Sequence, residues 1–287
     1  MANYQIFTDS GSDLPESLRN TLNVKMVSLS LLFRGEVLPD SVSGEIQEMY
    51  NALRAGEEAK TSAVNPETWA AAMEPTLAAG EDILVLAFSS GLSATCQSAV
   101  IAAEELMEKY PGRTIKVVDS LCASLGEGLF VYHVCKKRDE GLSLEELAAW
   151  AEENKLRLCH WFTVDDLMYL KRGGRVSAAT AIVGSLLQIK PVLHVDNEGH
   201  LINVSKSRGR KASIDALAAK MEQTMLPGQN EVAYICHGDC LEDAEYLAAR
   251  IKERCGVKEV FIGYTGAVIG SHAGPGVLAL FFLGDHR

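Results

Sequence analysis

The sequence lacks the features that mark several large classes of protein. No apolar run reaches the roughly 18 residues of a membrane-spanning helix, and the first residues do not follow the pattern of a signal peptide. Lys and Arg number 27 against 38 Asp and Glu, a net charge of -11. This balance argues against a general nucleic-acid binder, because phosphate binding needs clustered positive charge. The nucleotide-binding fingerprints, GxxxxGK(S/T) and a GxGxxG after a strand, are also missing.

The cysteines do not form a zinc-type pattern. There are seven of them, without a CxxC pair, so they are expected to be reduced thiols in a cytoplasmic protein. The segment Cys236-His237-Gly238-Asp239-Cys240 carries metal-ligand side chains, but no second pair of ligands accompanies it. No metal is therefore expected.

Length and element order predict a two-domain α/β protein. The 287 residues suit two domains of ordinary size. The apolar runs 83–88 and 115–118 are each followed by a polar loop and a helix, which predicts an N-terminal three-layer domain with a parallel sheet. In the second half, strands near 191–195 and 201–205 flank a turn at 196–199, which indicates a mixed α+β domain. The boundary is placed so that the domains are 1–156 and 157–287.

Two hydroxyl-rich loops, 60–66 and 89–95, are each predicted to meet the start of a helix. Several Ser and Thr side chains, together with Gly91, exceed what helix capping requires. Free backbone N–H groups, hydroxyl donors and the positive end of a helix dipole suit a carboxylate or a phosphate. We therefore expect an anion site at the carboxyl edge of the parallel sheet.

Basic residues and one histidine are the other candidates. The clusters 171–175 and 206–211, around Arg172 and Arg208, indicate either solvated helix ends or a patch for an acidic partner or bound anion. His272 lies among glycines and a proline, which favours an imidazole held in a fixed place.

A hydrolase is the alternative hypothesis. Gly91-Leu92-Ser93-Ala94-Thr95 is one residue away from the nucleophile elbow GxSxG. In that interpretation Ser93 is the nucleophile, His272 the base and Asp119 the residue that orients the base.

The motifs, taken in order, resemble the DegV family of bacterial fatty-acid-binding proteins. The resemblance runs nearly end to end and rests on Thr8-Asp9-Ser10, Ser12-Asp13-Leu14-Pro15, Thr61-Ser62, Ser89 to Thr95, Asp119-Ser120, Asp166-Leu167 through Leu170 to Arg175, Leu187 to Pro191 and His272 to Gly276.

The resemblance implies a lipid-binding carrier without catalytic residues or cofactor. A long-chain fatty acid would lie between the two domains. Its carboxylate would be held at Thr61 and Ser93, with Ser62 and the backbone near Ala94 close by, and Arg175 and His272 in support. A partner fatty acid kinase would convert the ligand to acyl-phosphate for phospholipid synthesis. Acyl-chain length and saturation, oligomeric state and the kinase's identity stay open.

Two positions differ from the usual family pattern. Ala94 stands where glycine is usual, and Cys96 where an aromatic residue is usual. Ala94 is expected to narrow the carboxylate pocket, and Cys96 to alter the channel for the acyl tail.

Overall fold

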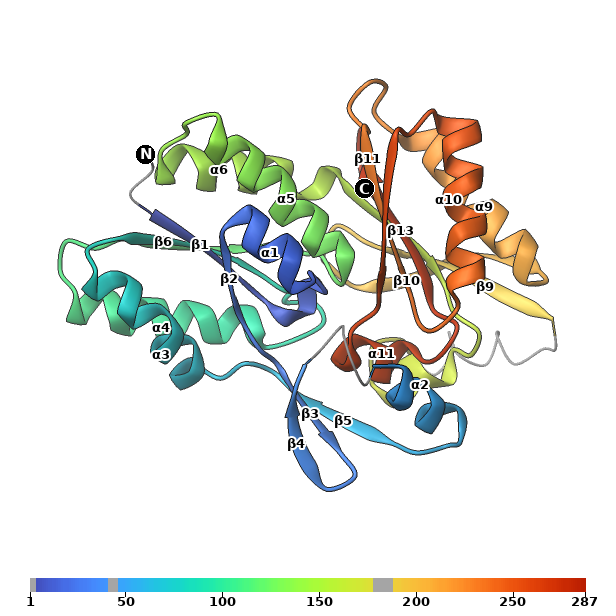
Figure 1. Ribbon diagram of the computed structural model, residues 1–287, viewed down its shortest axis with the longest axis horizontal. Coiled ribbons are helices and arrows are strands. Elements are labelled where there is room, and N and C mark those ends of the chain that lie inside the picture. The colour runs from blue at the N-terminus through green and yellow to red at the C-terminus, as the bar shows by residue number, and fades with distance from the viewer. Residues whose placement is uncertain (1–3, 41–45, 178–187) are drawn as a thin grey trace.

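The computed structural model describes residues 4–40, 46–177 and 188–287 and arranges them around three β-sheets (Figure 1). The first sheet is parallel, with the strand order β2-β1-β6-β7. Its strands are β1 (Tyr4–Asp9), β2 (Val24–Val27), β6 (Asp82–Ala87) and β7 (Ile115–Asp119).

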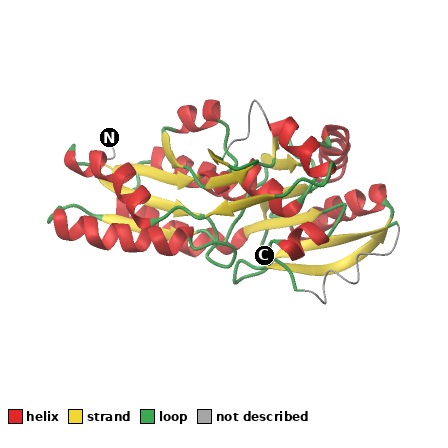
Figure 2. Ribbon diagram, turned by 90° about the horizontal axis from the view of Figure 1, so that it is seen from below, coloured by secondary structure: helices red, strands yellow, loops and turns green. Residues whose placement is uncertain are grey.

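Helices cover both faces of the parallel sheet, because successive side chains of a strand point to opposite sides. Ile6 and Leu84 face one side and Phe7 and Ile83 face the other, and all four are buried. The first side packs on α1 (Glu16–Leu22), α5 (Leu125–Asp139) and α6 (Leu144–Asn154), and the second on α3 (Pro66–Ala78) and α4 (Thr95–Lys109). Figure 2 shows helices on both sides of the strands. The predicted three-layer arrangement is confirmed.

Local signals explain where several of these helices begin. Asn65 Oδ1 accepts a hydrogen bond from Thr68 N at 2.8 Å, and Pro66 occupies the first helical position of α3. Ser143 and Glu146 form a reciprocal capping box at the start of α6. Short 3₁₀ turns cover Ser10–Ser12 and Lys155–Arg157.

A small antiparallel sheet with the order β4-β3-β5 links the N-terminal half to the C-terminal half. It consists of β3 (Ser30–Phe33), β4 (Glu36–Pro39) and β5 (Ala59–Ser62), and α2 (Ile46–Arg54) precedes β5 in the chain. This unit packs against α11 (Ala267–Ala273), which comes from the far end of the sequence. The buried Tyr50 completes the contact, since its hydroxyl donates to the backbone oxygen of Thr265 at 2.7 Å.

The third sheet is mixed and has the order β10-β9-β8-β13-β11-β12, in which only the β11–β12 pair is parallel. Its strands are β8 (Leu158–Thr163), β9 (Ile189–Val195), β10 (Leu201–Arg208), β11 (Val232–His237), β12 (Glu259–Tyr264) and β13 (Leu278–Leu283). Helices α9 (Arg210–Thr224) and α10 (Leu241–Cys255) cover one face. The short helix α7 (Met168–Arg172) follows β8. The predicted turn at 196–199 joins β9 and β10, with Gly199 at a φ of 78°.

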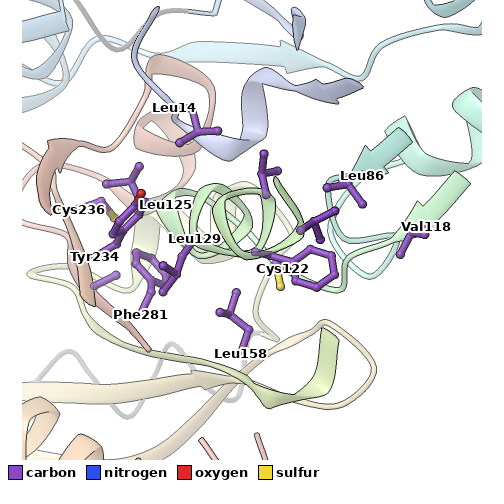
Figure 3. Packing of buried hydrophobic residues seen from close by; sticks show 14 of the residues in the cluster. Leu14, Leu86, Val118, Cys122, Leu125, Leu129, Leu158, Tyr234, Cys236 and Phe281 are labelled. Atoms are coloured by element: carbon purple, nitrogen blue, oxygen red, sulfur yellow. The ribbon is translucent and has the colours of Figure 1, made fainter. Parts of the chain in front are cut away.

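Helix α5 lies in a core that the two larger sheets share (Figure 3). Leu125 and Leu129 of α5 are fully buried in it. The parallel sheet contributes Leu86 and Val118 from one side, and the mixed sheet contributes Tyr234, Cys236 and Phe281 from the other. The two halves of the chain are therefore joined by continuous apolar packing.

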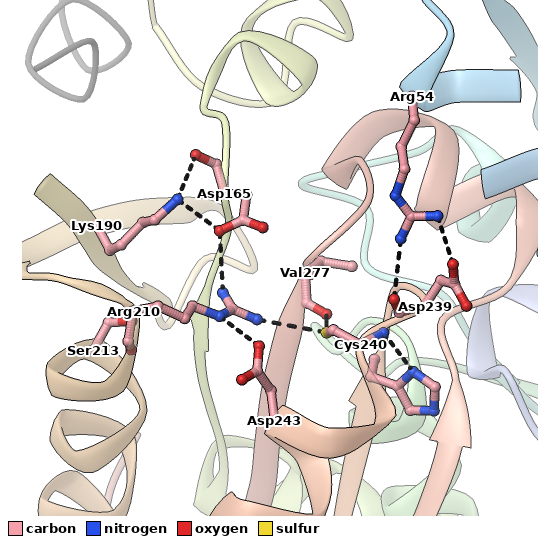
Figure 4. A network of polar contacts seen from close by, with 10 residues as sticks. Arg54, Asp165, Lys190, Arg210, Ser213, Asp239, Cys240, Asp243 and Val277 are labelled. Atoms are coloured by element: carbon pink, nitrogen blue, oxygen red, sulfur yellow. Dashed lines mark hydrogen bonds and ion pairs between the residues drawn. The ribbon is translucent and has the colours of Figure 1, made fainter. Parts of the chain in front are cut away.

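Ion pairs hold further parts of the C-terminal half in place (Figure 4). Arg54 of α2 contacts the carboxylate of Asp239 at 2.5 Å, and Arg210 contacts that of Asp243 at 2.8 Å. All seven cysteines are free. Within the described ranges, no helix combines the length and the apolarity that crossing a bilayer would need.

Candidate functional site: a cavity with a hydroxyl-lined end

A cavity of about 160 Å³ lies between the loops of the N-terminal half and the α5-facing side of the mixed sheet. Most of its wall is apolar. The apolar side chains come from both halves of the chain: Leu29, Ala63, Phe88, Leu92, Ala123, Phe162, Leu170, Val195, Leu201, Val268, Ile269, Ala273, Val277, Ala279 and Phe281.

The six residues predicted from the sequence all line this cavity. They are Thr61, Ser62, Ser93, Ala94, Arg175 and His272. They lie on separate elements: β5, the loop before α4, the segment after α7, and α11. The fold thus brings together hydroxyls, an imidazole and a guanidinium that lie as much as 211 positions apart in the chain.

Thr61 and His272 form the first polar pair. Thr61 Oγ1 lies 2.7 Å from His272 Nε2. Burial, together with the positive charge of Arg175, lowers the pKa of His272 to about 4, so the ring is neutral at neutral pH. A side chain at position 173 would collide with the imidazole, because a Cβ there would lie 2.2 Å from His272 Nδ1. Gly173 therefore lets the ring approach Thr61.

Ser93 is held from behind by Thr95. The two hydroxyl oxygens are 2.9 Å apart, and the backbone N–H of Thr95 donates to Ser93 Oγ at 3.2 Å. Thr95 is fully buried, and its own Oγ1 accepts a hydrogen bond from Val64 N at 3.3 Å. With Thr95 as the donor, the proton of Ser93 is free to point into the cavity. Thr95 was not among the predicted site residues, although it belongs to the same hydroxyl-rich loop.

Arg175 brings a positive charge to the cavity, and some of its guanidinium N–H groups donate to backbone carbonyl oxygens. Its Nε and Nη2 donate to the carbonyl oxygen of Leu92 at 3.2 and 2.9 Å, and Nη1 donates to that of Gly173. Burial lowers the pKa of Arg175. The guanidinium therefore ties the loop that carries Ser93 to the C-terminal half, besides adding its charge to the site.

The polar end adjoins a surface groove of about 550 Å³. Thr61, Arg175 and His272 line both spaces. The groove adds Lys60 and Arg172 to the positive charge, together with Glu57 and Glu58. The polar end is thus the part of the cavity that lies nearest to this groove.

The geometry contradicts the hydrolase hypothesis. His272 Nε2 contacts Thr61 and not Ser93, while Ser93 Oγ contacts Thr95. The carboxylate of Asp119 accepts hydrogen bonds from the backbone N–H groups of Ser90 and Leu121, both at 3.1 Å. In the part of the chain that the structure describes, the relay from nucleophile to base to carboxylate is therefore not assembled.

Two further expectations need correction. Thr61 does not lie in a loop at the edge of the parallel sheet; it is in β5, paired with Leu31 of the antiparallel sheet. Cys96 is buried but does not line the cavity, so it does not shape the channel directly. In the second basic cluster, Arg210 pairs with Asp243 (Figure 4), while Lys206, Arg208 and Lys211 are exposed.

The Cys236–Cys240 segment packs as ordinary secondary structure. Cys236 is buried in β11, and His237 Nδ1 accepts a hydrogen bond from Cys240 N at 3.3 Å, just before α10. Among the described residues, no group of three or more His, Cys, Asp or Glu side chains is arranged to hold a metal ion.

Fold and site together define a two-domain α/β protein with an apolar cavity that ends in hydroxyls. The chain belongs to the DegV family, which is described as uncharacterised proteins and whose model matches residues 3–285. A DegV domain-containing protein of Clostridium perfringens is 46% identical over 289 residues, which cover 100% of this chain and 99% of that protein.

Solved structures of the family share the whole fold. A DegV family protein of Thermus thermophilus, described for its fatty acid binding, matches with a TM-score of 0.87 and 33% identity, over 98% of this chain and 99% of the other. DegV of Bacillus subtilis, described as a fatty acid binding protein, matches with a TM-score of 0.83 and 28% identity, over 99% and 100%.

Proposed function

We propose that this protein binds one long-chain fatty acid in the cavity, between a domain of residues 1–156 and a domain of residues 157–287. The observation that carries the proposal is the cavity itself, whose wall is mostly apolar and also includes Thr61, Ser93, Arg175 and His272. Fatty acid binding described for relatives with the same fold supports it.

The polar end suits a carboxylate. If His272 carries its proton on Nε2, it donates to Thr61 Oγ1, and the hydroxyl of Thr61 then donates to the ligand. If Thr95 donates its hydroxyl proton to Ser93 Oγ, the hydroxyl of Ser93 can likewise donate to the ligand. A buried carboxylate needs such donors, because an unpaired charge in an apolar site is costly. Ser62, the backbone of Ala94 and the charge of Arg175 complete the surroundings.

The apolar wall would supply most of the binding free energy. Each CH₂ group that leaves water contributes about 0.8 kcal/mol, so an acyl chain has a strong driving force to fill the cavity. Part of this is offset by the lost freedom of the chain and of the ligand. The hydroxyl end would then fix the orientation of the ligand more than its affinity.

We further propose a carrier without catalytic activity of its own, acting in the cytoplasm. It would present the carboxylate to a partner fatty acid kinase, which forms acyl-phosphate for phospholipid synthesis. The groove beside Thr61, Arg175 and His272 supports this role, because it adjoins the carboxylate end and not the tail. The missing nucleotide fingerprints agree with ATP binding by a separate protein.

Extraction of the purified protein, followed by mass spectrometry of the organic phase, tests the binding proposal. We expect one long-chain fatty acid per chain. Leu201→Trp, which fills the cavity, is expected to abolish the co-purified lipid. Ile202→Trp is the matched control, because the next residue of β10 points to the other face and is 39% exposed. Equal lipid content in both variants, or no lipid in the unmodified protein even after palmitate is added, would overturn the proposal.

A further inference from the structure

Besides the predicted site residues, four polar side chains line the cavity. His160 of β8 has both ring nitrogens in hydrogen bonds, with Leu158 O at 3.1 Å and with Ala123 N at 3.3 Å, which leaves three others. Ser124 precedes α5, Cys236 lies in β11 and Thr265 follows β12, and all three line the cavity. Each is buried, with exposures of 5%, 1% and 0%. A chain of CH₂ groups offers none of them a hydrogen bond.

The three differ in how their hydrogen bonds are satisfied. Ser124 Oγ donates to the carboxylate of Asp13 and lies 3.2 Å from Cys236 Sγ. Thr265 Oγ1 is directed at the Cys236 thiol, a weak acceptor, and has no oxygen or nitrogen partner among the described residues. The backbone of Thr265 is satisfied, since its N–H donates to His237 O at 2.9 Å. The side-chain hydroxyl therefore has only the weak contact with the thiol, whereas buried hydroxyls in proteins are usually fully paired.

Helix α11 sets the distance between this hydroxyl and the carboxylate end. Thr265 lies just before the helix and His272 near its end, with Val268 and Ile269 of the same helix lining the cavity between them. From the N-cap Gly266 to His272, six steps at the helical rise of about 1.5 Å per residue span about 9 Å, and Thr265 precedes Gly266. A ligand whose carboxylate is near His272 would thus pass Thr265 in the middle of its acyl chain.

We propose that the cavity contains a second polar subsite, at Thr265, for an oxygen atom carried in the middle of the acyl chain. The ligand class is a long-chain fatty acid with a mid-chain hydroxyl or keto group, whose oxygen accepts a hydrogen bond from Thr265 Oγ1. Ser124 and Cys236 form the rest of the polar surface around it. This inference rests on the proposed fatty acid binding and adds a preference among fatty acids.

Competition binding of 10-hydroxystearate and stearate tests the subsite. The measured quantity is the ratio of the two affinities. In Thr265→Val, which keeps the shape and removes the hydroxyl, this ratio is expected to fall about tenfold, the loss of one hydrogen bond. Thr265→Ser is expected to keep the ratio of the unmodified protein. Thr163→Val is the matched control, because Thr163 is equally buried and its Oγ1 also lacks a described partner, but it does not line the cavity.

The possible results separate this inference from the proposed function. If stearate binds and Thr265→Val leaves the ratio unchanged, the subsite is refuted while fatty acid binding stands; a water molecule at Thr265 would give this result. If Thr163→Val lowers the ratio as much as Thr265→Val, the effect is general and the subsite is again refuted. If neither ligand binds the unmodified protein, both the proposed function and the subsite fail.

Discussion

Replacing Thr61 by valine removes the hydroxyl that is paired with His272 and keeps the β-branched shape that suits β5. A hydrogen bond to a charged group contributes about 1.5–3 kcal/mol. We therefore expect the dissociation constant for palmitate to rise by a factor of about 10 to 150. The thermal stability of the ligand-free protein should change little, because Thr61 is only half-buried.

Isothermal titration with palmitate, together with thermal unfolding of the ligand-free protein, separates these two effects. Thr21→Val is the control, since Thr21 is exposed on α1 and its hydroxyl donates only to Ser17 O. An unchanged affinity in Thr61→Val would show that the carboxylate lies elsewhere. A large loss of stability with an unchanged affinity per folded molecule would assign Thr61 a structural role instead.

Three further predictions concern other parts of the molecule. Burial raises the pKa of Asp9 from 3.8 to about 7, so between these pH values the folded protein holds a proton that the unfolded chain has released, and its stability falls as the pH rises. Relative to Asp9→Asn, the free energy of unfolding from urea denaturation should fall by about 4 kcal/mol between pH 4 and pH 8. Equal pH dependence in the two proteins would refute this prediction. Thr95→Val should weaken palmitate binding several-fold, because Ser93 loses the hydroxyl that orients it. Thr95→Ser keeps this hydroxyl and should bind palmitate as tightly as the unmodified protein. Weak binding in Thr95→Ser as well would mean that Thr95 acts through packing. Gly199→Ala should lower the midpoint of thermal unfolding more than Gly228→Ala. Both glycines have positive φ, but of the two only Gly199 would bring an added Cβ into collision with another residue. Equal shifts would mean that the turn relaxes to avoid the collision at no cost in stability.

The parts of the fold that local chemistry determines could be predicted from the sequence. The cap at Asn65 and the capping box at Ser143 and Glu146 each depend only on residues within one turn of the chain, so the sequence is sufficient to predict these two helix starts. The parallel sheet followed from apolar runs that each lead into a helix. The sequence predicts a loop where β5 lies, since Ala59–Ser62 has no apolar alternation and is a strand only because it pairs with β3.

The residues of the candidate site could be predicted from sequence motifs, but their hydrogen-bond partners could not. Neither the contact of His272 with Thr61 nor that of Arg175 with the carbonyl of Leu92 follows from local sequence, because each joins segments that are distant in the chain. The same holds for Thr265, whose neighbours come from β11 and from the start of α5. Such contacts depend on how the sheets and α11 pack against each other.

The most direct test of the account is the carbon NMR signal of palmitate labelled at its carboxyl carbon and bound to the protein. We expect a single bound resonance at the position of an ionised carboxylate, and it should stay ionised at pH values where free fatty acid becomes protonated. The double variant Thr61→Val, Ser93→Ala should shift this resonance or abolish it. A bound signal that titrates like free palmitate, and that the double variant leaves unchanged, would contradict the central claim that these hydroxyls hold the head of the lipid.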